Sequence, residues 1–293
     1  MMAHAYPSPT IAVAAGKGGT GKTLLATSLA LVLQDAYPGR VQFLDCDVEE
    51  PNAHLLLRPT LERTEPVTVR VPEVDLEACT RCGQCAAACQ NSAIAVIRQA
   101  VLTLPQLCSG CGACSYVCPA AAIAEVPRQV GVISAGRTAE GIEFHTGCLN
   151  VGEAKATPVS KAVKGRVRED LITIIDAPPG TACPMQEAVT DADYCILITE
   201  PTPFGLSDLR AAVETCRSVG TPCGIVINRH GSGFTGVEEY CASDGLALLG
   251  LIPQDRGIAE AYSRGEAILG REPRWQRLLL DFMAVVFRTI NNK

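Results

Sequence analysis

The chain has 293 residues, of which 47% are hydrophobic and 19% charged, enough for one sizeable α/β core and a small appendage. Its 25 basic and 31 acidic residues give a net charge of −6, which offers no electrostatic footprint for nucleic acid. No apolar run reaches the roughly 18 residues of a membrane span, and Met1–Pro9 lacks the pattern of an export signal, so we expect a cytoplasmic protein. In that compartment its 15 cysteines indicate metal binding more than disulfides.

The first expected element is a buried strand over Thr10–Ala15, and a glycine-rich loop follows it directly. In loops of the pattern G-x-x-x-x-G-K-[ST], backbone N–H groups close on phosphates and the next helix points its positive end at them. Lys22 is predicted to hold the β- and γ-phosphates, and Thr23 the magnesium ion. An accidental glycine-rich turn is the alternative, and the order strand, loop, helix argues against it. The loop reads Gly16-Lys17-Gly18-Gly19-Thr20-Gly21-Lys22-Thr23.

A second lysine, Lys17, follows the first glycine of this loop. With it the loop resembles the deviant Walker A motif of MinD, the partition ATPases and the nitrogenase iron protein. The resemblance implies that Lys17 reaches across a nucleotide-sandwich dimer to the partner's phosphates. The expected functional unit is therefore two chains, either a homodimer or a heterodimer with a related ATPase.

Two aspartates follow the next expected strand. A helix over Leu24–Leu33 ends near Tyr37, and a strand over Val41–Leu44 leads into Asp45 and Asp47. Carboxylates at the carboxyl end of a strand are well placed to meet magnesium and the γ-phosphate. By resemblance to switch I of the same class, Asp47 would orient the attacking water and Asp45 would belong to the magnesium shell. The alternative is that both acids only cap a loop. Residues 60–71, between prolines, are interpreted as a connector.

Residues 72–125 carry a cysteine pattern that occurs twice. Each cysteine of the first group recurs 29 residues later, and Ser92-Ala93-Ile94 is matched by Ala121-Ala122-Ile123, which indicates an internal duplication. The first group is Cys79, Cys82, Cys85 and Cys89, and the second is Cys108, Cys111, Cys114 and Cys118.

This spacing is typical of iron–sulfur ligation, in which three closely spaced thiolates bind one cluster and the fourth reaches the neighbouring cluster. The segment resembles a bacterial two-cluster ferredoxin. Cys118 is followed by proline as that pattern asks, whereas Cys89 is followed by Gln90, which we expect to alter packing without removing the ligand. Two structural zinc sites are the alternative, although zinc does not need this crossover. The predicted 4Fe-4S ligand sets are Cys79, Cys82, Cys85 and Cys118 for one cluster, and Cys108, Cys111, Cys114 and Cys89 for the other.

Beyond Glu125 the α/β pattern resumes. Strands are expected over residues 130–134 and 142–144, a helix over 154–163, and a doubly buried parallel strand over 171–176. That strand ends in Asp176-Ala177-Pro178-Pro179-Gly180, which resembles Walker B joined to switch II. The resemblance implies that Asp176 binds magnesium through its water shell and that the Gly180 N–H donates to the γ-phosphate.

The last strands lead to residues on the nucleotide side of the sheet. A strand over 194–199 enters a loop, residues 200–205, to which the sequence assigns no residue-level role. Asn228, after the strand over 224–227, resembles the asparagine that reads the base in this class; a turn-forming asparagine is the alternative. Pro253, after the strand over 246–252, is expected to contact the base edge.

The final helix, after Pro273, has an apolar stripe with arginines near its beginning. It resembles the membrane-binding helix of MinD, but such stripes more often pack on a core, so a membrane is not an expected partner. The stripe contains Trp275, Leu278, Leu279, Phe282, Val285 and Val286.

Seven cysteines lie outside the repeat, and most read as small buried thiols. Cys183 lies seven residues after Asp176, and Cys148 precedes Asp176 by 28. This placement resembles the nitrogenase iron protein, in which two cysteines per chain hold one 4Fe-4S cluster on the dimer axis. We therefore hypothesise a bridging cluster on Cys148 and Cys183; the alternative is one packed thiol and one loop thiol.

Taken together, the motifs resemble MinD/Mrp-superfamily P-loop ATPases that carry an inserted ferredoxin domain. The resemblance implies an α/β fold with a doubly wound, mainly parallel sheet from residues 1–71 and 126–293, and a small ferredoxin-like α+β domain over 72–125. Its implied cofactors are ATP, Mg²⁺ and two 4Fe-4S clusters per chain, and its implied reaction is hydrolysis of ATP to ADP and phosphate.

Three purposes stay open at this point. ATP could gate electron transfer from the clusters to an unidentified redox protein or metalloprotein. The chain could instead carry or assemble iron–sulfur or metal clusters. It could also be a redox-sensing, MinD-like positioning ATPase.

Overall fold

The structure is a computed structural model that describes residues 8–98, 100–231 and 233–292. The expectation that no export signal is present rests on Met1–Pro9, of which residues 1–7 lie outside the described residues.

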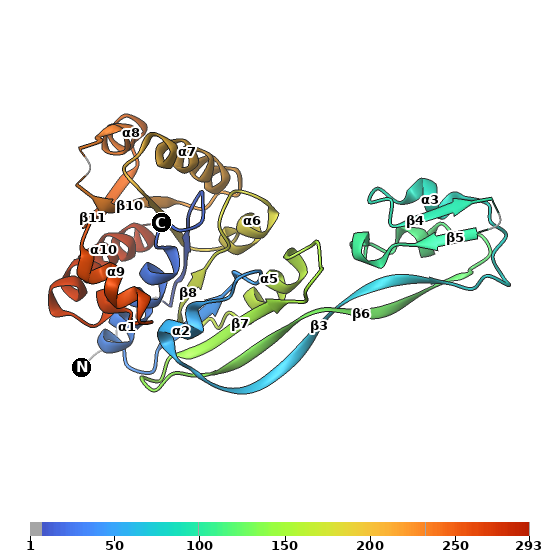
Figure 1. Cartoon of the computed structure of the whole chain (residues 1–293), viewed down its shortest axis with the longest axis horizontal. Helices are drawn as coiled ribbons and strands as arrows, with labels where there is room; N and C mark the ends of the chain where they lie inside the picture. Colours follow the sequence, from blue (N-terminus) through green and yellow to red (C-terminus); the bar gives the residue numbers. More distant parts are fainter. Residues whose placement is uncertain (1–7, 99, 232, 293) are drawn as a thin grey trace.

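A nine-stranded sheet organises most of the described chain (Figure 1). The seven strands from β11 to β7 are parallel, and β6 and β3 join antiparallel at one edge. The expected mainly parallel sheet is confirmed. Its order is β11 (Ala247–Pro253), β10 (Cys223–His230), β9 (Tyr194–Thr199), β1 (Thr10–Ala14), β8 (Ile172–Asp176), β2 (Val41–Asp45), β7 (Glu143–Leu149), β6 (Ile123–Arg137) and β3 (Thr60–Val74).

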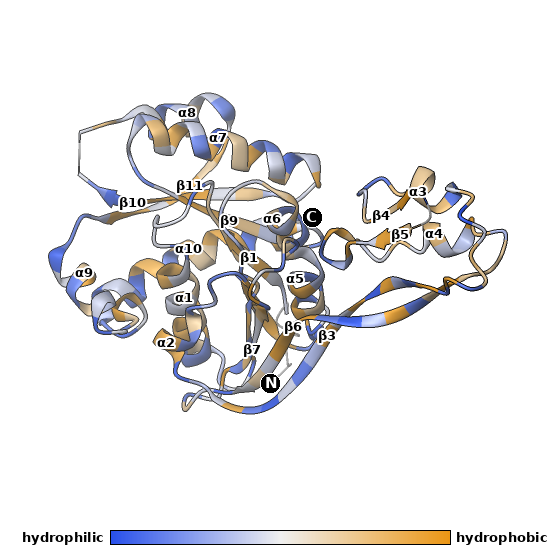
Figure 2. Ribbon diagram, turned by 45° about the vertical axis from the view of Figure 1, so that its right-hand side comes forward, coloured by the Kyte–Doolittle hydropathy of each residue, from blue (hydrophilic) through white to orange (hydrophobic). Residues whose placement is uncertain are grey.

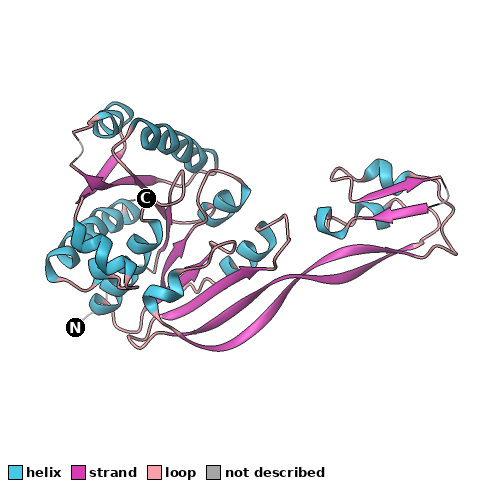
Figure 3. Cartoon of the chain, viewed as in Figure 1, coloured by secondary structure: helices cyan, strands magenta, loops and turns pink. Residues whose placement is uncertain are grey.

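Helices cover both faces of this sheet (Figure 3). Along β1 the side chains alternate, with Ile11 and Val13 in one buried cluster and Ala12 and Ala14 in the other. This period of two, with both faces apolar, is what a parallel strand between two helical layers requires. The first cluster includes α1 (Lys22–Ala36), α2 (Ala53–Leu57), α9 (Arg256–Ser263), η2 (Ile268–Gly270) and α10 (Pro273–Asn291); the second includes α5 (Thr157–Lys164), α6 (Cys183–Val189), α7 (Pro203–Ser218) and α8 (Gly236–Asp244).

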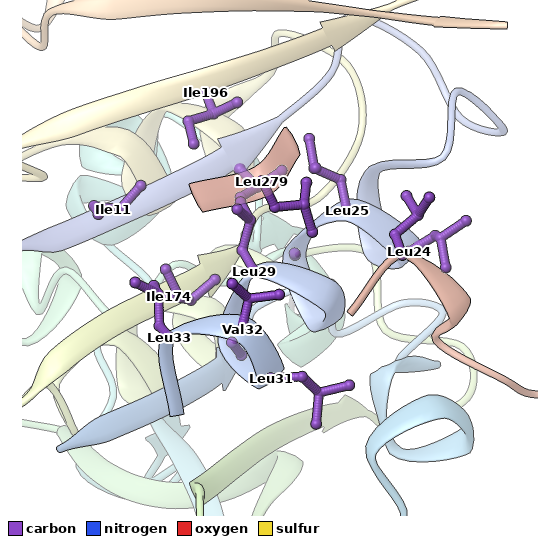
Figure 4. Packing of buried hydrophobic residues seen from close by; sticks show 14 of the residues in the cluster. Ile11, Leu24, Leu25, Leu29, Leu31, Val32, Leu33, Ile174, Ile196 and Leu279 are labelled. Carbon is purple, nitrogen blue, oxygen red and sulfur yellow. The ribbon is translucent and has the colours of Figure 1, made fainter. Parts of the chain in front are cut away.

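Helix α1 is the most deeply buried helix around the predicted phosphate loop. Every residue from 22 to 34 is buried. Figure 4 shows Leu25 and Leu29 of α1 among Ile11 of β1, Ile174 of β8 and Leu279 of α10. A helix fixed along its whole length holds its N-terminus, and therefore the loop before it, in one position.

The apolar stripe of α10 packs into the body of the protein. Trp275, Leu279, Phe282 and Val286 are buried, and their neighbours Leu278 and Val285 are partly buried against the same cluster. The stripe therefore serves the core, which was one of the two alternatives for this helix. Among the described residues, no helix is both long and apolar enough to cross a membrane.

An antiparallel ribbon of β3 and β6 carries residues 75–122, here called the cysteine module, away from the rest of the protein, here called the body (Figure 1). The stretch interpreted as a connector is most of β3, and its prolines are tolerated because β3 is the edge strand. The boundaries expected at 71/72 and 125/126 fall within these two continuous strands. The module contains α3 (Gln84–Ala88), β4 (Ile94–Ile97), β5 (Ala100–Thr103), η1 (Pro105–Leu107) and α4 (Ala113–Tyr116).

The two halves of the cysteine module have matching backbones. Both short helices begin after a left-handed glycine, and each half has further left-handed residues at equivalent places. These pairs are again 29 residues apart, as the cysteines are, so the repeat in sequence is also a repeat in conformation. The pairs are Arg81 with Gly110, Gly83 with Gly112, and Ser92 with Ala121.

The body and the module differ in how much they bury. Hydrophobic residues line the central strands of the body (Figure 2) and form two large buried clusters there. Among the described residues of the module, the buried hydrophobic side chains are Cys85, Ala93, Ile94 and Ala122.

Candidate nucleotide and cluster sites

The phosphate loop is shaped by two glycines that have no room for a side chain. A Cβ on Gly16 would lie 2.3 Å from the carbonyl oxygen of Asp208 in α7. A Cβ on Gly21 would lie 2.5 Å from Nδ2 of Asn228, and the φ of Gly21 is +93°. Glycine at both positions lets the loop pass between α7 and the end of β10.

Two carboxylates contact the ammonium group of Lys22, and a third, Asp45, is buried nearby. Its Nζ lies 2.6 Å from Oδ1 of Asp176 and 3.3 Å from Oδ2 of Asp47. The Thr23 hydroxyl donates to Oδ2 of Asp176 over 2.7 Å. Asp45, fully buried, accepts from the backbone N–H groups of Asp47 and Ala53. The strands β1, β2 and β8 thus bring together the lysine, threonine and acids predicted from separate motifs.

Burial and charge act together on these groups. Burial opposes the charge of Lys22, but Asp176 and Asp47 outweigh it, so the pKa of the ammonium lies above its ordinary value of 10.5. Burial and the neighbouring Asp176 raise the pKa of Asp45 well above 3.8. Burial also raises the pKa of Asp47, although Lys22 opposes it. Such crowding of acids is relieved by a divalent cation, which fits a magnesium site.

Lys17 is held within its own chain by Glu200, a residue for which no role was predicted from the sequence. Its Nζ lies 3.4 Å from Oε2 of Glu200, at the end of β9. Glu200 also pairs with Arg229, whose guanidinium donates to the carbonyl oxygen of Gly19 over 3.4 Å. The signal was available, because Glu200 follows a buried parallel strand and such strand ends line the ligand crevice.

A cavity of about 960 Å³ opens beside the phosphate loop, at the upper end of the range for small-molecule sites. Helix α9 supplies Arg256 and Tyr262 to its wall, and the sequence reasoning missed this helix although Asp255 caps its N-terminus. Asn228 reaches the wall with its amide nitrogen donating to the carbonyl oxygen of Thr20, 2.7 Å away. The predicted residues in the lining are Lys17, Gly18, Gly19, Gly21, Lys22, Thr23, Asp47, Asn228 and Pro253.

Two buried polar atoms, one in the phosphate loop and one beside the cavity, are free to bind a ligand. Among the described residues the buried hydroxyl of Thr20 and the buried carbonyl oxygen of the Asn52 side chain have no protein partner. Polar atoms buried without partners are costly, so these atoms fit a bound polar group. The Gly180 N–H, by contrast, donates to the carbonyl oxygen of Ala15 over 3.0 Å, so its predicted bond to the γ-phosphate requires switch II to move.

The eight repeat cysteines line two cavities in the module. One cavity, here called the proximal cavity, is lined by Cys89, Cys108, Cys111 and Cys114, together with Arg70 and Pro72 of β3. The other, the distal cavity, is lined by Cys79, Cys82, Cys85 and Cys118, together with Val74 at the outer end of β3. Each cavity therefore takes three cysteines from one half of the repeat and the fourth from the other half.

Backbone N–H groups point at the sulfur atoms in a repeated way. The N–H two residues after Cys79 and after Cys108 lies 3.4 Å from each Sγ, and the N–H four residues after Cys89 and after Cys118 lies 3.2 and 3.3 Å away. Such donors stabilise thiolates, the form that binds iron. The described residues contain no group of His, Cys, Asp or Glu side chains arranged around one metal ion. The donor set fits clusters, in which each thiolate binds a different iron.

Cys148 and Cys183 are both exposed. Cys148 lies near the carboxyl end of β7, and Cys183 begins α6, beyond the predicted switch II. Both cysteines lie near or after strand ends at the same carboxyl-terminal edge of the sheet as Asp45 and Asp176, because β7, β2 and β8 are parallel. The bridging cluster stays a hypothesis.

The fold and the phosphate loop define a P-loop nucleotide-binding protein. The family model described as the CobQ/CobB/MinD/ParA nucleotide binding domain matches residues 11–268. The chain belongs to this family.

Several relatives and solved structures are similar to the chain. An uncharacterized protein of Methanocaldococcus jannaschii is 30% identical over 262 residues, covering 88% of this chain and 91% of that protein. The cytosolic Fe-S cluster assembly factor Nubp2 homolog of Aedes aegypti is 25% identical over 285 residues, covering 90% of this chain and 89% of its own. MinD of Pyrococcus horikoshii, complexed with Mg-ADP, is 19% identical with a TM-score of 0.56 and 95% of each chain covered, which supports the fold.

Proposed function

We propose that this protein is a dimeric ATPase in which nucleotide state gates electron transfer from two 4Fe-4S clusters to a partner protein. The observation that carries the proposal is the pairing of a P-loop site with two cavities, each lined by four cysteines drawn from both halves of a repeat. A protein whose bound nucleotide controls electron transfer from its clusters needs both kinds of site.

The body supplies the ATPase roles in this proposal. Lys22 and the loop amides bind the phosphates, Thr23, Asp45 and Asp176 form the magnesium site, and Asp47 orients the attacking water. Lys17 leaves Glu200 and reaches the partner's phosphates when two chains meet. Catalysis then depends on positioning and on neutralising the phosphoryl charge.

The module supplies the redox roles. Cys79, Cys82, Cys85 and Cys118 hold the distal cluster, and the four cysteines of the proximal cavity hold the other. A 4Fe-4S cluster accepts and releases one electron. The N–H donors around the sulfurs favour the thiolate form that such ligation needs.

A second candidate function is assembly or transfer of iron–sulfur clusters. It is favoured by the similarity over nearly the whole chain to a protein named as a cytosolic Fe-S cluster assembly factor. Positioning on a membrane has no comparable support, because the apolar stripe of α10 is buried.

The decisive experiment is anaerobic iron quantification and EPR spectroscopy of the full chain, with and without ATP. Electron gating predicts about eight iron atoms per chain held stably, and reduction of an acceptor protein that is faster with ATP. Transfer of a labile cluster to an apo-ferredoxin, with the eight module thiolates still occupied, would favour the assembly function. A chain that binds zinc instead of iron would refute both.

A further inference from the structure

The module touches the body a second time, at a joint separate from the ribbon. Lys155, in the loop of residues 150–156 between β7 and α5, donates from Nζ to the carbonyl oxygen of Leu107 at 2.7 Å and to Oδ1 of Asn91 at 3.3 Å. Leu107 directly precedes Cys108, and Asn91 lies two residues after Cys89. The ammonium group of Lys155 therefore bridges the two chain segments that supply cysteines to the proximal cavity. Figure 1 shows the chain before α5 extending toward the module.

A second contact fixes the same loop. Arg128 of β6 binds both carboxylate oxygens of Glu153 and also donates to the carbonyl oxygen of Pro105 over 3.2 Å. The hydrogen bond to Arg128 lowers the pKa of Glu153, which keeps this carboxylate charged. Arg128 and Glu153 neutralise each other, whereas the two contacts of Lys155 are neutral oxygens. Among the described residues no ion pair involves Lys155, so it adds a positive charge to the joint.

The other side of this loop is bonded to the segment after β2 that contains Asp47. The N–H of Leu149, the last residue of β7 before the loop, donates to the carbonyl oxygen of Val48 over 2.8 Å. The hydroxyl of Ser160, in α5 directly after the loop, donates to the carbonyl oxygen of Cys46 over 3.0 Å. Both ends of the Lys155 loop are therefore tied to residues that flank Asp47.

We propose that Lys155 is a positioning residue that links the nucleotide site to the proximal cluster. This proposal rests on the proposed function, because it requires a cluster in the proximal cavity. The positive charge stabilises the reduced cluster, which carries one more negative charge, and so raises its reduction potential. Movement of the Asp47 segment on nucleotide exchange shifts the loop and hence the distance of this charge. Because Lys155 contacts only the segments of the proximal cavity, the proximal cluster is the one whose potential responds to ATP.

The test is an EPR-monitored redox titration of the full chain, loaded with iron and sulfide, using dithionite as the reductant. Each protein is titrated with ADP and with a non-hydrolysed ATP analogue. The variants are Lys155→Gln, Lys155→Arg, and Arg81→Gln, which removes a charge from the lining of the distal cavity. Lys161→Gln removes a charge from an exposed position on α5 and is the control.

We expect Lys155→Gln to make one of the two midpoint potentials more negative and to abolish the difference between the two nucleotides at that cluster. Arg81→Gln should move the other potential and keep the nucleotide effect, and Lys155→Arg should resemble the unaltered chain. Amide hydrogen exchange at residues 106–108 should rise in Lys155→Gln, which reports the open joint without relying on the clusters.

The proposal is overturned if Lys155→Gln moves neither potential or both equally, or if the nucleotide effect survives in that variant. A chain that holds no iron after loading refutes the proposed function itself. A chain with both clusters and potentials that ignore Lys155 refutes only the joint.

Discussion

The body and the cysteine module obtain their order from different sources. The body buries two extended apolar clusters on the two faces of its sheet, so its fold is stabilised by the burial of hydrophobic surface. The module, over residues 75–122, buries few hydrophobic side chains among those the structure describes. A segment of that size with so small a core needs metal or covalent cross-links to be stable. The difference indicates that cysteine ligation of iron would both stabilise the fold of the module and supply its redox chemistry.

Removing iron should therefore separate the two regions, and this is the largest effect we expect. Iron-free chain, prepared by anaerobic chelation, should lose hydrogen-exchange protection throughout residues 75–122 while residues 10–36 stay protected, because metal binding there is folding free energy. Trp275, the only tryptophan, is buried in the body and should keep its fluorescence. A module that stays protected without iron would show that the comparison is wrong.

Replacing Lys22 should damage the body alone. Lys22→Ala removes the cation between Asp176 and Asp47, and we expect ATP hydrolysis to fall about 10²–10³-fold. In nucleotide-free and magnesium-free protein, the free energy of unfolding should fall by about 3 kcal/mol because buried carboxylates lose their partner. Phosphate release and urea unfolding measure the two effects. Lys161→Ala, at an exposed position, is the matched control, and an equal loss there would contradict this assignment.

The Cys148 and Cys183 hypothesis predicts a cluster that belongs to neither region. With it, a dimer holds about twenty iron atoms, and Cys183→Ala lowers this to about sixteen, a loss of about a fifth. Iron per dimer, measured after gel filtration with ATP, decides the matter. About sixteen iron atoms in both proteins would leave Cys148 and Cys183 as ordinary thiols.

Freeing Lys17 should have a smaller effect on the body. Glu200→Gln weakens the partly exposed ion pair that holds Lys17 within its own chain, so dimerisation with an ATP analogue should tighten by up to about fivefold. Analytical ultracentrifugation gives the dissociation constant. Glu214→Gln, at an exposed ion pair on α7, is the control. Weaker dimerisation in Glu200→Gln would mean that Glu200 supports the dimer instead of opposing it.

The smallest expected effect concerns pH and the body. Burial lowers the pKa of His145 below 6.5, although Glu143, 3.0 Å away, opposes this. The folded protein then binds fewer protons than the unfolded chain, so stability falls as the pH drops below about 6.5, by at most about 1.4 kcal/mol per pH unit for this group. His145→Gln should flatten that slope between pH 7.5 and 5.5, followed by urea unfolding with Trp275 fluorescence. An unchanged slope would assign the acid sensitivity to other groups.

The local motifs were readable because their chemistry depends on short spacings. The phosphate loop spans eight residues, Asp45 and Asp176 each come at the end of an apolar run, and the cysteines recur at a constant interval of 29 residues. The continuous apolar run over residues 171–176 predicted a parallel strand with both faces covered, and β8 confirms it. The extended ribbon was not predicted, because Pro66 and Pro72 argue against a strand from sequence alone. A strand tolerates these prolines only at the edge of a sheet, where β3 lies.

By itself, the sequence predicted a phosphate-binding loop and two sets of four cysteine ligands. Only the tertiary structure decided which groups meet from distant parts of the chain: Lys22 with Asp176, Lys17 with Glu200, and Lys155 with the segments beside Cys89 and Cys108. The physical reason is that a ligand motif is held by backbone geometry over a few residues. A contact between charges far apart in sequence depends on how whole strands and helices pack.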